Sequence, residues 1–371
     1  MRVLFFGTYE RDYPRNAQVA ACLRRAGVEV VERHASVWEG REHKWDVGPA
    51  AALRLAAAQA RLLVPRGERF DVVRVGYPGH LDMLAAKLVA RGRPVVLDPL
   101  VSLSDSFVAD RGRFAPGTPA ARTLEWIDRG ALRAADLVVA DTEAHAAFLA
   151  RLGDLPRERV AVCMVGAEER VFRPRDASTG DASAVSAGEP FTALFVGKLI
   201  PLHGVETVVA AARLAPELRW RVVGSGQLAA ALADAPPNVE RVPWIPYEQL
   251  PSELWRAGCA LGVFGTSEKA ARVIPNKAFQ ALACGAPLVT GDTPGARELL
   301  ADGVSALLVP PGDPAALAAA VRRLAADTAL RERIAGGGHA AYLGQASEAV
   351  LGERWRGLLE ELVARRTGRA R

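Results

Sequence analysis

Glycine and basic residues gather in the middle of the chain, where residues 191–210 read FTALFVGKLIPLHGVETVVA. The apolar run ends at Gly197 and Lys198, and His203 and Gly204 precede a second, helix-like run. Glycine lets the backbone approach a ligand closely, and the free N–H groups at the start of a helix favour an anion. Lys198 adds a full positive charge beside these groups. The segment therefore predicts a site for a diphosphate group.

A second basic segment, residues 272–285, reads RVIPNKAFQALACG. Pro275 and Asn276 are typical of the start of a helix, whose free N–H groups would point at an anion. Lys277 is therefore a candidate for contact with a phosphate or a sugar. The alternative is an ordinary capped helix start with Lys277 in solvent.

Strand-like and helix-like runs alternate along both halves of the chain and must position these segments. In the first half, apolar strands are expected at 3–7, 28–32, 71–76, 94–98, 136–141 and 159–165. In the second half, they are expected at 191–197, 218–224, 238–242, 259–264, 287–291 and 306–309. Continuous apolar strands between helices indicate parallel sheets that are covered on both faces. Ligands of such sheets bind beyond the carboxyl ends of the strands, which is where Gly7 and Gly197 lie.

A polar segment separates the two halves. Residues 175–190, RDASTGDASAVSAGEP, lack periodicity and are typical of a linker. We therefore expect a first domain at 1–174, a linker at 175–190 and a second domain at 191–345. Gly336, Gly337 and Gly338 are expected to interrupt the tail before a final amphipathic helix at about 346–366. Because no strand follows that helix, we expect residues 346–371 to pack back on the first domain.

The composition limits the classes of partner. The 371 residues include 47 basic and 42 acidic side chains, and no block of basic residues is interleaved with aromatics, so nucleic acid is not expected as a partner. The four cysteines are far apart, which indicates buried thiols in a reducing cytoplasm rather than disulfides or a metal site. The start, MRVLFFGT, is expected to form a core strand and not a signal peptide. No apolar run has the length of a membrane span.

Five segments in order resemble the family-4 (group 1) retaining glycosyltransferases of GT-B fold. They are VGAEERVFRP (165–174), VGKLIPLHG (196–204), VVGSGQL (222–228), VPWIPYEQLPSEL (242–254) and FQALACGAPLVTGDTPGARELL (279–300). The resemblance covers nearly all of the chain. It implies an α/β protein with two Rossmann-like, doubly wound parallel-sheet domains that face an inter-domain crevice. The C-terminal helix would cross back to the first domain.

The resemblance also implies how the donor would be held. The two positions that hold the donor diphosphate in the family fall on Lys198 and His203. The glycine turns fall on Gly197, Gly204 and Gly224, and the segment that cradles the base contains Trp244 and Ile245. Asn276 and Lys277 would add to this donor site.

The chain departs from the family at a pair of glutamates eight positions apart, which fall here on Arg272 and Gln280. Gln280 can still accept hydrogen bonds from a ribose. Arg272 cannot replace a carboxylate, but it could pair with the donor phosphates. We therefore expect Lys198 and Arg272 to serve catalysis by stabilising the departing diphosphate.

The first domain is expected to receive the acceptor, again by resemblance. Candidate residues follow its strands: Thr8, Tyr9, Tyr77, His80, Asp98, Ser102 and the segment 141–143. Asp98 could accept a proton from the acceptor hydroxyl, and the alternative is a turn-forming Asp-Pro. For His80, an ordinary histidine at a helix start is the favoured alternative.

The expected activity is transfer of a hexosyl group from a nucleotide diphosphate donor to an acceptor hydroxyl, the EC 2.4 class. Retention, no metal and no cofactor besides the donor co-substrate follow from the resemblance. The acceptor could be a saccharide, a lipid-linked saccharide or a small natural product. The alternatives are a nucleotide-sugar 2-epimerase and a non-catalytic sugar-nucleotide-binding subunit.

A cytoplasmic protein is expected, with peripheral contact to the inner membrane face as one use of its basic and aromatic residues. This contact would involve the helix expected at 50–64 and the residues near it: Trp38, Arg41, Lys44, Trp45, Arg54 and Arg61. Ordinary packing of that helix on the sheet is the alternative.

Overall fold

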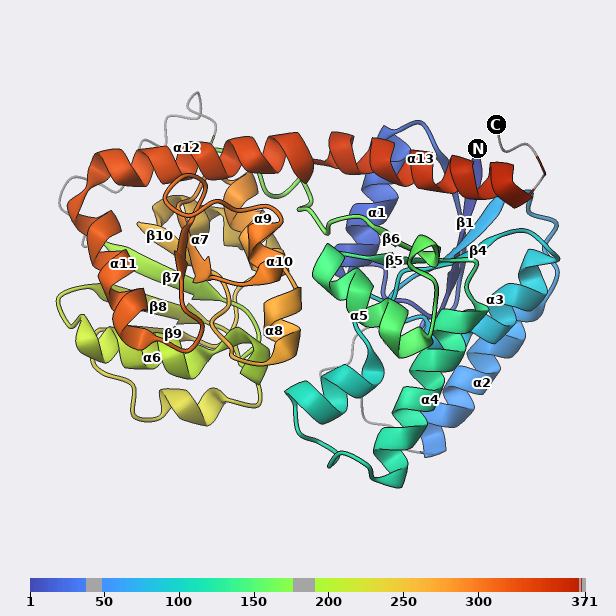
Figure 1. Cartoon of the computed structure of the whole chain (residues 1–371), viewed down its shortest axis with the longest axis horizontal. Helices are drawn as coiled ribbons and strands as arrows, with labels where there is room; N and C mark the ends of the chain where they lie inside the picture. The colour runs from blue at the N-terminus through green and yellow to red at the C-terminus, as the bar shows by residue number, and fades with distance from the viewer. Residues whose placement is uncertain (38–48, 176–190, 367, 369–371) are drawn as a thin grey trace. The chain divides into compact units, whose positions relative to one another are not determined.

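A computed structural model describes residues 1–37, 49–175, 191–366 and 368 (Figure 1). Residues 176–190 of the expected linker lie outside the described residues, as do Trp38, Arg41, Lys44 and Trp45. Contacts within the chain divide it into two compact units. Unit 1 comprises Met1–Val165 and the residues from Glu348 onward, and unit 2 comprises Gly166–Ser347.

Unit 1 is built on a six-stranded parallel sheet with the strand order β2-β1-β3-β4-β5-β6. Its strands are β1 (Arg2–Gly7), β2 (Glu29–His34), β3 (Val72–Val75), β4 (Val95–Leu97), β5 (Leu137–Ala140) and β6 (Val160–Val162). Val3 of β1 lies opposite Val30 on one side and Val72 on the other. Successive residues of a strand face opposite sides of the sheet, so the apolar run of β1 supplies two separate cores.

Helices cover both faces of this sheet. On one face lie α1 (Pro14–Arg25) and the last helix, α13 (Glu348–Arg366). On the other face lie α2 (Pro49–Leu63), α3 (Met83–Ala90), α4 (Pro119–Ala134) and α5 (Glu143–Gly153). Trp355 of α13 is fully buried in the core beside α1. Gly352 permits this packing, because a Cβ atom there would lie 2.4 Å from the carbonyl oxygen of Cys22.

Unit 2 contains a second six-stranded parallel sheet with the order β12-β11-β10-β7-β8-β9. Its strands are β7 (Thr192–Val196), β8 (Arg219–Val223), β9 (Val239–Val242), β10 (Cys259–Leu261), β11 (Leu288–Gly291) and β12 (Leu307–Val309). Its helices are α6 (Val205–Leu214), α7 (Leu250–Arg256), α8 (Glu268–Arg272), α9 (Asn276–Ala283), α10 (Pro294–Arg297), α11 (Pro314–Ala326) and α12 (Thr328–Gln345). Phe195 and Trp220 are fully buried at its centre.

The expected interruption at Gly336–Gly338 is wrong, because these residues lie inside the continuous helix α12. The glycines instead allow close packing. A Cβ atom on Gly337 would lie 2.1 Å from the carbonyl oxygen of Val304, and one on Gly338 would lie 2.8 Å from that of Ser305. Among the residues that the structure describes, no helix is long and apolar enough to cross a membrane.

Candidate functional site

The order of the strands in unit 2 places a ligand site beside β7. Strand β7 pairs with β8 on one side and with β10 on the other, so the chain winds in opposite directions from it. A crevice opens at such a point beyond the carboxyl ends of the strands. The Gly197–Gly204 segment follows β7, and Arg272 and Lys277 follow β10. The topology therefore brings the two basic segments of the sequence to one place.

Gly197 lies at the centre of this place. A Cβ atom built on Gly197 would lie 3.2 Å from both Lys277 Nζ and His203 Cε1. Its φ of 142° lies in the region that favours glycine. Gly224, with φ of 152°, follows β8, and a Cβ atom there would lie only 1.9 Å from the carbonyl oxygen of Gly197. Both glycines keep the turn narrow and leave its backbone open to a ligand.

Lys277 is the most informative side chain of the site. It is only 9% exposed, and its Nζ lies 3.5 Å from the centre of the Phe195 ring. Among the described residues, this Nζ has no hydrogen-bond partner. Burial lowers the pKa of Lys277 well below its ordinary value. Because a buried donor without a partner costs free energy, the arrangement indicates a missing acceptor and favours an anion.

The first turn of α9, on which Lys277 lies, adds further donors. No side chain caps the start of this helix, since Pro275 occupies the capping position before Asn276. The N–H of Ala278 donates to the carbonyl oxygen of Pro275 at 2.9 Å, whereas the N–H groups of Asn276 and Lys277 have no backbone partner among the described residues. The helix dipole favours a negative charge beside them. The helix start and Lys277 together offer donors of the kind that phosphate oxygens accept from.

His203 lies beside Lys277 but is held uncharged. Its Nδ1–H donates to the carbonyl oxygen of Lys198, which leaves Nε2 as the other ring nitrogen. Burial and then the nearby Lys277 lower the pKa of His203 well below its ordinary value. Neutral Nε2 is an acceptor and cannot donate to a phosphate. His203 would therefore have to take up a proton to bind a diphosphate.

Lys198 and Arg272 occupy different environments. Lys198 is exposed on the turn after β7. Arg272 ends α8 and is only 8% exposed, and its Nη1 lies 3.2 Å from Glu268. Glu268 itself is open to solvent, so this pair is one that a ligand can compete with.

The candidates for holding a nucleoside lie on α9 and in the segment between β9 and α7. Gln280 is buried on α9 and interacts with the hydroxyl of Tyr247. Trp244 is 73% exposed, and Ile245 is half-buried. An exposed tryptophan offers a flat apolar surface that suits an aromatic base.

In unit 1, the predicted acceptor residues lie at the carboxyl edge of the sheet, and all except Glu143 are buried. The N–H and hydroxyl of Thr8 donate to the carboxylate of Asp82 at 2.7 and 3.0 Å. The hydroxyl of Tyr9 lies 3.4 Å from Glu32. The ring of Tyr77 lies 4.5 Å from that of Tyr13.

Asp128 of α4 joins two further acceptor candidates. Its carboxylate accepts from the hydroxyl of Ser102 at 2.7 Å, and His80 Nε2 lies 3.3 Å from it. Burial lowers the pKa of His80 below its ordinary value, although the Asp128 charge opposes this. These contacts fix the loops after β3 and β4 to each other.

The environment of Asp98 does not favour its predicted role. Asp98 is fully buried, and its carboxylate accepts from Arg15 Nε at 3.0 Å and Arg74 Nη2 at 2.5 Å. Burial alone would raise the pKa of Asp98, but the two guanidinium groups hold it below its ordinary value. Such a carboxylate is a poor proton acceptor, so we assign Asp98 to holding the strand ends together.

Sequence reasoning missed this cluster and the partners Asp82 and Asp128. One signal was available, because Arg74 interrupts the apolar run of β3 and so implies a buried partner. The hydroxyls and N–H groups that surround Asp82 and Asp128 come from distant loops. No local pattern indicates them.

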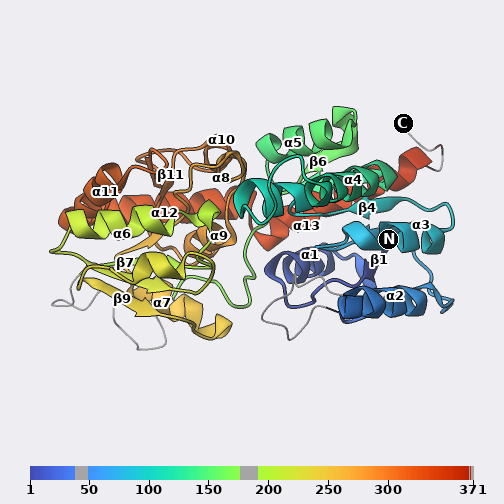
Figure 2. The same ribbon diagram turned by 90° about the horizontal axis from the view of Figure 1, so that it is seen from below.

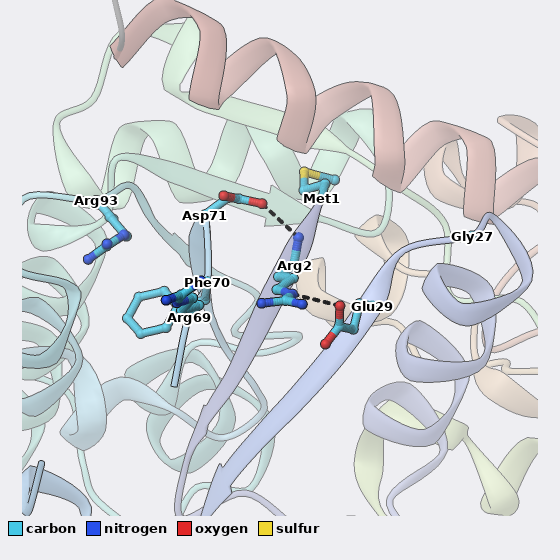
Figure 3. Close-up of a pocket in the computed structure, with 8 residues that line it drawn as sticks. All are labelled: Met1, Arg2, Gly27, Glu29, Arg69, Phe70, Asp71 and Arg93. Carbon is cyan, nitrogen blue, oxygen red and sulfur yellow. Dashed lines mark hydrogen bonds and ion pairs between the residues drawn. The ribbon is translucent and has the colours of Figure 1, made fainter. Parts of the chain in front are cut away.

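A separate depression of about 660 Å³ lies at the opposite, amino edge of the unit 1 sheet (Figure 3). Arg2 crosses it, with its backbone N–H 2.7 Å from Asp71 and its Nε 2.6 Å from Glu29. Ligands of parallel sheets bind at the carboxyl edge. We therefore do not assign function to this depression.

Comparison with known proteins gives consistent results. A family model described as glycosyl transferases group 1 matches residues 190–327, and one described as glycosyl transferase 4-like domain matches residues 1–166. A D-inositol 3-phosphate glycosyltransferase from Nocardioides sp. is 30% identical over 340 residues, which are 84% of this chain and 71% of that protein.

Two solved structures are similar over most of the chain. Sucrose-phosphate synthase from Thermosynechococcus elongatus has a TM-score of 0.74 at 17% identity, covering 98% of this chain and 99% of that one. Anabaena HepE in complex with UDP has a TM-score of 0.69 at 16% identity, covering 97% of this chain and 100% of that one. At such identities the likeness concerns the fold.

Proposed function

The chain belongs to the group 1 glycosyltransferases and has the GT-B fold, and from this premise we propose that unit 2 binds the diphosphate of its donor between Gly197 and the start of α9. The observation that carries this proposal is Lys277, a buried amine that has no partner among the described residues. It lies where the strand order opens a crevice.

The chemistry of glycosyl transfer explains why such a site is useful. When the sugar leaves, negative charge develops on the β-phosphate, and fixed donors around that phosphate lower the barrier. Lys277 and the N–H groups of α9 are fixed donors of this kind. Lys198 and Arg272 are further cations that would pair with the diphosphate. His203 would add a charge once it is protonated.

We propose uridine diphosphate as the nucleotide carrier. Anabaena HepE was solved with UDP and with UDP-glucose, and it supports testing this base first. Trp244 would stack on the base, and Gln280 would accept from the ribose. A thermal-shift screen against UDP, GDP, dTDP and ADP tests this choice, since a ligand raises apparent stability according to its affinity. A larger shift with another nucleotide would overturn it.

We further propose hexosyl transfer with retention and without a metal, as the family resemblance implies. Among the described residues, no group of three His, Cys, Asp or Glu side chains could hold a metal ion. NMR spectroscopy of the anomeric proton in the product tests retention. Activity that survives EDTA and gains nothing from Mg²⁺ or Mn²⁺ would support the metal-free reaction.

For the acceptor, we propose a polyol or sugar hydroxyl bound at the carboxyl edge of the unit 1 sheet. Relatives bear the name D-inositol 3-phosphate glycosyltransferase, which makes that compound the first acceptor to test. Lipid-linked saccharides and small natural products are the next classes. Incubation with each acceptor and UDP-glucose, followed by mass spectrometry, would detect a mass gain of one hexosyl group.

A donor assay without acceptor tests the proposed site and the two alternatives together. Slow release of free sugar and UDP supports a transferase. Interconversion of epimers would indicate a 2-epimerase, and binding without turnover would indicate a non-catalytic subunit. Lys277→Met should slow the release of sugar if Lys277 binds the diphosphate.

A further inference from the structure

Three neighbouring helices of unit 1 expose apolar side chains that are unusual for a surface. Helices α2, α3 and α4 cover the same face of the sheet, and α3 contacts both of the others (Figure 2). We call the outer surface of these helices the α2–α4 face. The exposed apolar side chains on it or beside its helix ends are Leu53, Leu63, Val64, Leu81, Leu84, Leu88 and Trp126.

Spacing places the exposed leucines before and within α3 on one outward face, whereas α2 and α4 each present isolated exposed apolar side chains. In α2, the buried positions Ala51, Ala58 and Leu62 face the sheet, while Leu53 is 74% exposed on the other side. Leu81, Leu84 and Leu88 follow the three- and four-residue spacing of one helix face, and Leu84 is 75% exposed. Since these helices already bury their other sides against the sheet, the exposed apolar side chains do not contribute to the core of unit 1. Large exposed apolar patches mark sites of interaction.

The charges on this face are basic. Four exposed arginines have no ion-pair partner among the described residues: Arg54, Arg61, Arg91 and Arg122. In α4, Trp126 is 74% exposed and lies on the same helix face as Arg122, Arg129 and Arg133. The acidic side chains here are engaged, Glu125 with Arg129 at 2.6 Å and Asp136 with Lys87 at 3.0 Å.

We propose that the α2–α4 face docks on an anionic lipid bilayer. Leucine and tryptophan side chains can enter the boundary between headgroups and acyl chains, while flanking arginines attract anionic headgroups. The charge favours lipid over a second copy of the chain, because two identical basic faces would repel each other. Docking of unit 1 would bring the transferase to a membrane surface, and it does not depend on which donor or acceptor the enzyme uses.

Sedimentation with vesicles tests this proposal on the full chain. Vesicles of phosphatidylcholine are compared with vesicles that also contain phosphatidylglycerol. We expect binding to the second kind only, weakened by salt. Replacing both Arg54 and Arg122 with glutamine should weaken binding roughly five-fold per arginine, the equivalent of about 1 kcal/mol for each basic residue near an anionic surface.

The role of the apolar side chains is tested by the triple variant Leu53→Glu, Leu84→Glu and Trp126→Glu. All three side chains are about three-quarters exposed, so these substitutions should not affect folding. The matched control is Leu214→Glu with Val304→Glu, two exposed apolar residues of unit 2. Loss of binding in the triple variant alone, with an unchanged melting curve, supports the proposal. Absence of vesicle binding by the unaltered chain, or equal loss in the control, would overturn it. So would a dimer in sedimentation velocity that only the triple variant abolishes, because that result assigns the face to a second copy.

Discussion

Replacing Lys277 with methionine should stabilise the free protein and lower its affinity for UDP. The side chain is only 9% exposed, and its Nζ has no partner among the described residues. A buried polar group without a partner costs about 1–3 kcal/mol. Methionine removes this polar group and keeps a contact with the Phe195 ring through its sulfur. For a unit the size of Gly166–Ser347, each kcal/mol corresponds to about 2–4 °C in Tm.

The same substitution should cost affinity for a diphosphate. A hydrogen bond to a charged group contributes about 1.5–3 kcal/mol, which is about 10- to 150-fold in Kd. Isothermal titration calorimetry with UDP and with uridine measures this loss, and uridine is the control because it has no phosphate. Calorimetric unfolding of the free protein measures the gain in stability. Equal losses for UDP and uridine, or a lower Tm without ligand, would refute the reasoning.

Four further outcomes are expected. Lys198→Ala should weaken UDP binding far more than uridine binding, and equal losses in titration calorimetry would count against its phosphate role. Arg272→Ala should lower kcat in a donor assay, while an unchanged rate would make the arginine a bystander. His203 is neutral in the free protein, and a bound diphosphate favours its charged form, so UDP binding should take up a proton. The affinity for UDP should therefore increase as pH falls from 8 toward 6, by at most about tenfold per pH unit. His203→Lys should flatten that pH profile. Asp98→Ala should destabilise unit 1 by about 3–5 kcal/mol in urea unfolding, because it leaves Arg15 and Arg74 buried without their carboxylate. A loss of activity in a stably folded variant would instead favour a catalytic Asp98.

Sequence patterns predicted the strand order that brings the two basic segments of unit 2 together. Alternating apolar strands and helices indicated parallel sheets, and a glycine at the end of β7 indicated a ligand turn there. The convergence of Gly197 with Lys277 follows once β10 is placed beside β7. Each of these steps rests on local spacing and on general rules of connection.

The burial and the partners of each side chain could not be predicted from such local patterns. Nothing local to Lys277 shows that Phe195 covers it or that no partner reaches it. The proline after Asp98 is compatible with a surface turn, and only Arg15 and Arg74 reveal a buried ion cluster. Gly337 was misread as a break because its neighbour, the carbonyl of Val304, comes from another segment. Burial and partners depend on contacts between distant segments.

The return of α13 to unit 1 affects how this chain can be made and checked. The polypeptide leaves unit 1 at Val165 and re-enters it only at Glu348, so a ribosome must synthesise all of unit 2 before Trp355 can close the core beside α1. Until then, the apolar side of α1 stays uncovered and is a target for chaperones. A product that terminates early would keep that surface exposed even with unit 2 fully folded. Synthesis of α13 is thus a condition for a finished first unit, and copies that lack α13 offer proteases the uncovered side of α1.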